Sequence, residues 1–109
     1  MKLVLVCYSG SSASILRDRM LAWARANLLD VEIIVSSLAG LDEDKEDADI
    51  VLVRPQVRCA LASVRERVPE RIPVMAVDTR DYGMAKGDRV MQAALDEIRQ
   101  YKEQKIHME

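Results

Sequence analysis

The sequence predicts an α/β domain with a parallel sheet, and two features of the 109-residue chain indicate it. Four short apolar runs alternate with segments that have the 3.6-residue spacing of amphipathic helices. The run 2–6 is apolar after Lys2, and the run 50–53 is apolar throughout. Such continuous runs are typical of strands buried on both faces of a parallel sheet. Alternating strands and helices therefore predict three layers, with helices flanking the sheet and right-handed crossovers.

The individual elements follow from local patterns. Strands are predicted over 2–6, 30–35, 50–53 and 73–77; in the second, apolar residues alternate with other side chains. Three helices are expected. The first follows the Ser-rich segment that ends at Ser14, and the third begins at about Gly87. The second begins at Pro55, since proline suits the first helical position. Buried helix faces are expected at Leu16, Met20, Trp23, Ala24 and Asn27, at Val57, Ala60, Leu61, Val64 and Val68, and at Val90, Met91, Ala94, Leu95, Ile98 and Tyr101.

The remaining segments are predicted to lie outside regular structure. The acidic stretch 42–47 is expected to be a short helix or a solvated loop. Residues 78–84 are expected to form a polar loop, in which Gly83 supplies an unusual backbone angle. The charged tail 102–109 is expected to fray.

Four strands in one sheet favour the flavodoxin-like order 2-1-3-4, which places the first strand in the middle. In this order a crevice lies beyond the carboxyl ends of the first and third strands, where the residues from Cys7 and from Pro55 onward would meet. One domain over 1–109 is expected, with its core at about 2–101.

Composition excludes several classes of function. The formal net charge is −2, and basic and acidic residues are interleaved, whereas a nucleic-acid-binding protein needs a concentrated basic surface. The apolar run at the N-terminus is too short for a signal peptide or a membrane span. We therefore expect a cytoplasmic protein without direct membrane insertion, whose two cysteines, Cys7 and Cys59, are reduced thiols.

Cys7 is the strongest candidate for chemistry. It follows the first strand and opens a segment of small and hydroxylated residues, 8–14, that leads into a helix. Backbone N–H groups in such a segment form an anion-binding concavity, and the same field is expected to lower the thiol pKa. Transient phosphorylation of a cysteine requires this combination. A small buried cysteine beside a helix cap remains an equally good interpretation of these residues.

Other chemistries have weaker support. Small Cys-dependent phosphatases carry an arginine six residues after the cysteine, where this chain has Ala13, and an Asp-Pro pair that is absent here. Cys59 is expected to be structural, since apolar residues surround it in the sequence. His107 stands alone in the tail, so no metal site is predicted, and no nucleotide-binding motif occurs. A carrier is therefore favoured over a phosphatase.

The chain resembles the IIB component of the lactose/cellobiose/chitobiose class of the phosphoenolpyruvate-dependent sugar phosphotransferase system. The resemblance covers roughly 2–101. It rests on three segments in matching order and spacing: LVLVC followed by SGSSAS, then ADIVLVRPQVR, then IPVMAVDTRDYGMAKGDRVMQAAL.

The resemblance implies that Cys7 is phosphorylated and that a loop cradles its phosphate. The family's loop corresponds to Tyr8, Ser9, Gly10, Ser11, Ser12, Ala13 and Ser14. The phosphoryl group would come from a phosphohistidine on a IIA protein. It would pass to a sugar held by a membrane IIC permease, such as the β-linked disaccharides cellobiose or chitobiose, and no cofactor is implied.

Two departures from the family pattern bear on the site. Many relatives have a threonine where this chain has Ala13, and a glycine is common where it has Arg54. We expect Arg54 to face solvent. Gln56 and Arg58 are candidates to support the phosphocysteine or to dock a partner, with helix capping and a surface charge as the alternatives. A regulatory or phosphate-binding module with the same fold is the alternative function.

Overall fold

The described sheet has four parallel strands. The structure, a computed structural model, describes residues 1–7, 10–37, 40–41, 46–54 and 61–108. For residues 10–12 and 104–108 it describes the backbone alone. The strand order is β2-β1-β3-β4, and every pairing is parallel. The predicted sheet and its order are confirmed. The strands are β1 (Lys2–Val6), β2 (Glu32–Ser36), β3 (Ile50–Val53) and β4 (Val74–Ala76).

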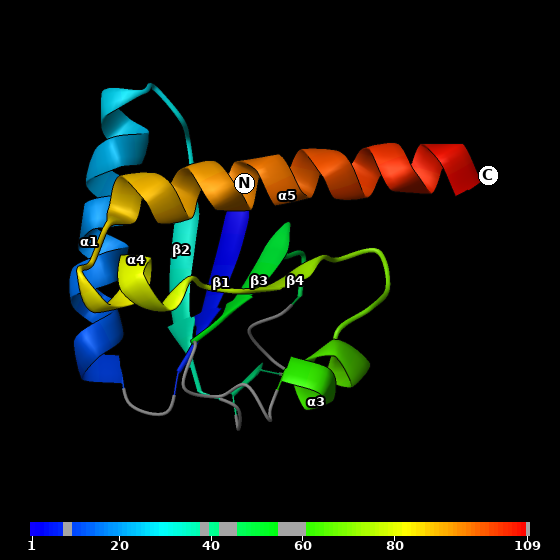
Figure 1. The fold of residues 1–109 in the computed structure, drawn as a ribbon, viewed down its shortest axis with the longest axis horizontal. Coiled ribbons are helices and arrows are strands. Elements are labelled where there is room, and N and C mark those ends of the chain that lie inside the picture. The colour runs from blue at the N-terminus through cyan, green and yellow to red at the C-terminus, as the bar shows by residue number, and fades with distance from the viewer. Residues whose placement is uncertain (8–9, 38–39, 42–45, 55–60, 109) are drawn as a thin grey trace.

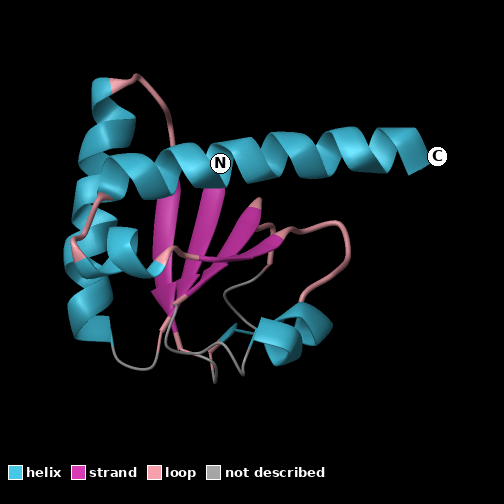
Figure 2. Cartoon of the chain, in the orientation of Figure 1, coloured by secondary structure: helices cyan, strands magenta, loops and turns pink. Residues whose placement is uncertain are grey.

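Helices lie on both faces of this sheet. Figure 1 shows α1 and the long α5 on one side and α3 on the other, and Figure 2 shows the same layers by type of structure. No helix in the described ranges is both long and apolar enough to span a membrane. The helices are α1 (Gly10–Ala26), α3 (Leu61–Arg67), α4 (Thr79–Gly83) and α5 (Gly87–Met108).

The sheet divides the core into two apolar clusters, because successive side chains of a strand point to opposite faces. In β1, Leu3 and Leu5 pack toward α1 and α5, and Cys7 continues this face. Val4 and Val6 pack on the other side with residues of α3, including Val64. The central strands are therefore buried on both faces, as their continuous apolar runs predict.

The segment after β4 differs from the prediction of a polar loop, because residues 79–83 form the short helix α4. Asp78 caps this helix: its carboxylate accepts hydrogen bonds from the Arg80 and Asp81 backbone N–H groups, both at 3.1 Å. The predicted unusual angle at Gly83 is also wrong. Ala85 instead has the positive φ, 51°.

Two helix ends also differ from the sequence prediction. The tail does not leave the helix at residue 102, because α5 continues to Met108. Residues 102–105, Lys-Glu-Gln-Lys, all have high helix propensity. Asn27, predicted on the buried face of the first helix, is exposed and lies just beyond the end of α1, where its amide donates to the Trp23 carbonyl at 2.8 Å.

The turn after α1 holds Leu28 in a left-handed conformation with a φ of 57°. The Leu28 N–H donates to the Arg25 carbonyl, and the Leu29 N–H donates to the Ala24 carbonyl. These two bonds make a Schellman turn, in which glycine usually occupies the left-handed position. The Leu28 side chain is 94% exposed, so little packing depends on it.

Replacing Leu28 by Gly is expected to raise the free energy of unfolding by up to about 1 kcal/mol. The left-handed conformation costs a side-chain-bearing residue roughly 1–2 kcal/mol, of which the greater unfolded-state entropy of glycine offsets only a part. Urea unfolding measures the change. The control is Ala22→Gly in the middle of α1, which is expected to lower the free energy of unfolding by about 1 kcal/mol. A loss of stability in Leu28→Gly would contradict the prediction.

Candidate functional site

The candidate site lies at the carboxyl edge of the sheet, where the two central strands end side by side. Cys7 follows β1 and Arg54 follows β3. Backbone hydrogen bonds extend the ladders past the strand ends: Cys7 N–H donates to the Ser36 carbonyl at 2.9 Å, and Arg54 N–H donates to the Val6 carbonyl at 3.1 Å. The sheet thus fixes the backbone of both residues. This edge is where ligands bind in open α/β sheets.

The helix α1 begins close to Cys7 in the sequence. Its first residue is Gly10, so 10–14 belong to the helix. The prediction of a loop over these residues is therefore wrong. The first turn of a helix has backbone N–H groups without helical partners and carries the positive end of the helix dipole. In the described chain, the backbone N–H groups of 10–14 that an anion could reach are therefore those of a helix start.

The Cys7 thiol is free and only 2% exposed. It is part of the apolar cluster between the sheet and the helices α1 and α5. Ala13, the position at which small phosphatases carry an arginine, is fully buried in the same cluster. Because an arginine there would have to occupy the core, the packing agrees with the absence of a phosphatase clamp.

Two influences of opposite sign act on the Cys7 thiol. Burial is the larger and raises its pKa above the ordinary value, because a thiolate removed from water is disfavoured. The positive charge of Arg54 lowers the pKa. The lowered pKa predicted from the sequence is therefore wrong for this thiol, since burial outweighs the neighbouring positive charge.

The raised pKa predicts that Cys7 ionises above the ordinary thiol value of about 8.5. Thiolate absorbance in the ultraviolet, followed against pH, measures this midpoint without any reagent having to reach the buried sulfur. The measurement uses Cys59→Ser, and subtracting the Cys7→Ser/Cys59→Ser double variant removes the absorbance of tyrosinate. A midpoint below 8.5 would show that the helix start and Arg54 outweigh burial.

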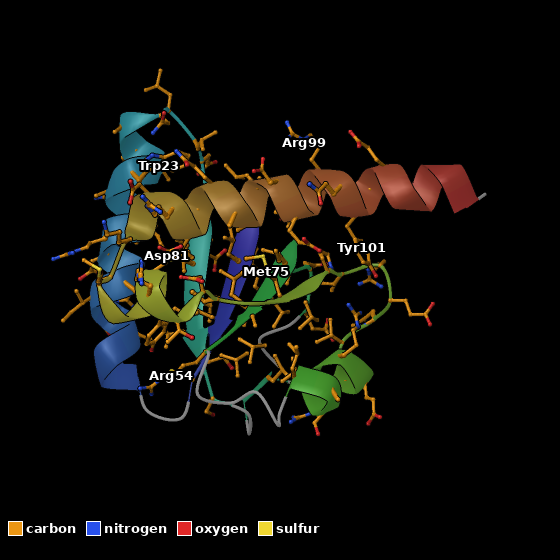
Figure 3. The ribbon with its side chains drawn as sticks, viewed as in Figure 1. Trp23, Arg54, Met75, Asp81, Arg99 and Tyr101 are labelled. Carbon is orange, nitrogen blue, oxygen red and sulfur yellow. The ribbon has the colours of Figure 1, made fainter. Side chains whose placement is uncertain are left out.

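Arg54 does not simply face solvent, contrary to the prediction. It is half-buried, and its guanidinium carbon lies 5.2 Å from the centre of the Tyr82 ring. This is a cation–π contact. Tyr82 is itself buried on α4 and belongs to the same cluster as Cys7. Figure 3 shows Arg54 below α4, near the start of α1.

Several predicted site residues cannot be placed. Tyr8, Ser9, Gln56, Arg58 and Cys59 lie outside the described residues, as do the side chains of Ser11, Ser12 and His107; Gly10 is described only as the first residue of α1. Ser14 is half-buried on α1. Among the described residues, no three His, Cys, Asp or Glu side chains gather as metal ligands. The structure therefore brings Cys7, Ala13 and Arg54 to one edge and adds Tyr82.

Comparison with known proteins gives a consistent result. Residues 2–93 match the family model described as the lactose/cellobiose-specific IIB subunit of the phosphotransferase system. The galactose-specific EIIB component of Lactococcus lactis is 32% identical over 98 residues, covering 84% of this chain and 91% of that protein. The oligo-beta-mannoside-specific EIIB component of Bacillus subtilis is 32% identical over 95 residues, covering 86% and 92%.

Solved structures have the same fold. The cellobiose-specific IIB component from Borrelia burgdorferi superposes with a TM-score of 0.78 at 29% identity, covering 93% of this chain and 94% of that one. The lactose-specific IIB domain from Streptococcus pneumoniae, at 17% identity and a TM-score of 0.73, covers 89% and 96% and supports the fold alone. The chain therefore belongs to the lactose/cellobiose-specific IIB family and is a phosphotransferase component of sugar transport.

Proposed function

We propose that Cys7 is the phosphoryl carrier of this IIB protein. One observation carries the proposal: the thiol stands at the carboxyl edge of the sheet, at the end of a central strand and three residues before the helix α1 begins. The helix start offers N–H donors to phosphoryl oxygens. Sulfur is a good nucleophile once ionised, and the thiolate is also a good leaving group, so it can both accept and release the group.

The reaction has two steps. In the first, the Cys7 thiol loses its proton to solvent, and the thiolate sulfur attacks the phosphorus of a phosphohistidine on the IIA partner. The S–P bond forms, the N–P bond breaks, and the imidazole nitrogen keeps the electron pair. In the second, a sugar hydroxyl oxygen attacks the phosphorus. The S–P bond then breaks, the sulfur leaves as thiolate, and the hydroxyl proton passes to solvent.

The partners follow from this relay. A phosphorylated IIA protein supplies the group, and a membrane IIC permease holds the sugar. The sugar is a β-linked oligosaccharide such as cellobiose or chitobiose; relatives with 32% identity are named for galactose, cellobiose and oligo-beta-mannoside. The cytoplasmic location expected from the sequence remains a prediction.

Sugar phosphorylation in a reconstituted relay tests the proposal. Membrane vesicles that hold a IIC permease of this class are incubated with phosphoenolpyruvate, the general relay proteins, a IIA protein, this protein and a panel of sugars. We expect a sugar phosphate that forms only when this protein is present, with cellobiose or chitobiose as the best substrate. A protein that becomes phosphorylated but phosphorylates no sugar with several IIC permeases would favour the regulatory alternative.

A further inference from the structure

Arg54 and Cys7 occupy neighbouring positions on the two central strands. The register pairs Val6 of β1 with Val53 of β3, so the next position along both strands pairs Cys7 with Arg54. Adjacent strands lie about 4.8 Å apart. The Arg54 N–H bond to the Val6 carbonyl keeps this pairing one residue beyond the end of the strand.

Both side chains also lie on the same face of the sheet. Ile50 and Leu52 of β3 pack toward α1 and α5, and alternate residues of a strand share a face. Arg54 continues this series, as Cys7 continues that of Leu3 and Leu5. The guanidinium therefore extends over the face on which the thiol lies.

Tyr82 restricts where the guanidinium can go. The ring is 8% exposed and belongs to the cluster that includes Cys7. Arg54 stacks on it with 5.2 Å between the guanidinium carbon and the ring centre. An arginine side chain loses considerable conformational entropy when it is immobilised. The cation–π contact with the fixed ring of Tyr82 offsets part of this cost, because the guanidinium gains the contact only when it lies over the ring.

We propose that Arg54, positioned by the ring of Tyr82, binds the oxygens of the phosphoryl group while it is attached to Cys7 and stabilises the charge that develops during transfer. This inference rests on the proposed function of Cys7. It assigns to this chain a positively charged ligand at a position where the family resemblance described in the sequence analysis implies that a glycine is common.

The chemistry of arginine suits this role. A guanidinium presents several N–H donors in one plane and forms paired hydrogen bonds with phosphoryl oxygens. During attack on the phosphohistidine, the thiolate charge passes partly to the phosphoryl oxygens, where a fixed positive group lowers the barrier. The same charge already favours the thiolate of Cys7. One residue therefore assists both ionisation and transfer.

The neighbouring elements α1 and α4 carry other charged residues. Arg17 and Asp18 on α1 form an ion pair of 3.5 Å. Asp78 uses its carboxylate to cap α4, and Asp81 is half-buried on that helix. Within the described part of the chain, burial raises the Cys7 pKa and the charge of Arg54 lowers it. A variant of Arg54 therefore tests the contribution of that charge directly.

The test compares Arg54→Gln and Arg54→Lys with the control Arg80→Gln, all in a Cys59→Ser background. Arg80 is an exposed arginine on α4, so the control removes the same charge without touching the proposed ligand. Thiolate absorbance against pH gives the ionisation of Cys7, and transfer from phosphorylated IIA gives the rate. Arg54→Gln is expected to lower the thiolate fraction at neutral pH about tenfold and the transfer rate roughly 10- to 100-fold.

The other variants separate charge from geometry. Arg54→Lys keeps the charge but lacks the planar fork, so it should restore the thiolate fraction more fully than the transfer rate. Tyr82→Phe keeps the ring and should retain more of both readouts than Tyr82→Leu, which removes the ring. Equal losses in Tyr82→Phe and Tyr82→Leu would overturn the part assigned to the ring.

The outcomes also separate this inference from the proposed function. If Arg54→Gln matches Arg80→Gln in both readouts while the wild type accepts phosphoryl groups, the role of Arg54 is overturned and the carrier function stands. If the wild type accepts no phosphoryl group, the carrier function fails. The inference about Arg54 is then overturned as well, because it depends on that function, even if the absorbance titration shows that Arg54 favours the thiolate.

Discussion

Replacing Cys7 by Ser or Ala is expected to reduce phosphoryl transfer to sugar by at least about 10³-fold. Alanine has no nucleophile, and a serine hydroxyl is far less nucleophilic near neutral pH than a thiol that is partly ionised. The measurement is the initial rate of sugar-phosphate formation in the reconstituted relay. Cys59→Ser removes the other thiol of the chain and should keep a rate close to that of the wild type.

Folding of the variants must be checked because Cys7 is buried. Burying a serine hydroxyl without a partner costs about 1–3 kcal/mol, so urea unfolding is measured in parallel. Cys7→Ala introduces no polar group and provides the second test. Full relay activity in a folded Cys7→Ala protein would show that another residue carries the phosphoryl group.

Replacing Gly87 by Ala is expected to lower the free energy of unfolding by about 2–3 kcal/mol. Gly87 is the first residue of α5, and a Cβ built on it would lie 2.5 Å from the Arg19 carbonyl carbon and 2.5 Å from the Met20 nitrogen. Both atoms belong to the backbone of α1 and cannot move aside as a flexible side chain does. The two helices would have to separate, which would open the apolar cluster that includes Cys7.

Gly83→Ala is the matched control for this prediction. A Cβ at Gly83 has no atom within 4 Å, and no described glycine has a positive φ. Since Gly83 ends the helix α4, alanine should change the free energy of unfolding by less than about 1 kcal/mol. Similar stability of Gly87→Ala and Gly83→Ala, measured by urea unfolding, would contradict the close helix contact.

The central strands were predictable to the residue, whereas the outer strands were not. The bounds of β1 and β3 agree with the apolar runs 2–6 and 50–53, because burial on both faces leaves a continuous apolar pattern. The second strand begins at Glu32 and not at residue 30, since its pairing with Lys2 sets the start. Strand ends at a sheet edge thus depend on the neighbouring strand.

The helix α4 shows a limit of periodicity. It is too short for an apolar pattern. The signal that was present is Asp78, whose carboxylate caps the helix. Asparagine and aspartate favour turns as well as helix caps, so the sequence alone did not separate the predicted loop from a helix.

The position of Cys7 at the carboxyl edge of the sheet was predictable, but the surroundings of its side chain were not. The position of Cys7 after a buried strand predicts a reactive thiol. The strand pattern does not indicate how deeply the sulfur is buried, and burial reverses the expected pKa shift. The place of Arg54 follows from strand alternation after Ile50 and Leu52. Its contact with Tyr82 joins residues 28 positions apart and depends on how α4 packs.

The mass of the intact protein after phosphorylation tests the central claim most directly. The purified protein is incubated with phosphoenolpyruvate, the two general relay proteins and a IIA protein of this class. We expect the wild type and Cys59→Ser each to gain one phosphoryl group and Cys7→Ala to gain none. A phosphoryl group on Cys7→Ala, or none on a folded and reduced wild type with several IIA partners, would contradict the assignment of Cys7 as the carrier.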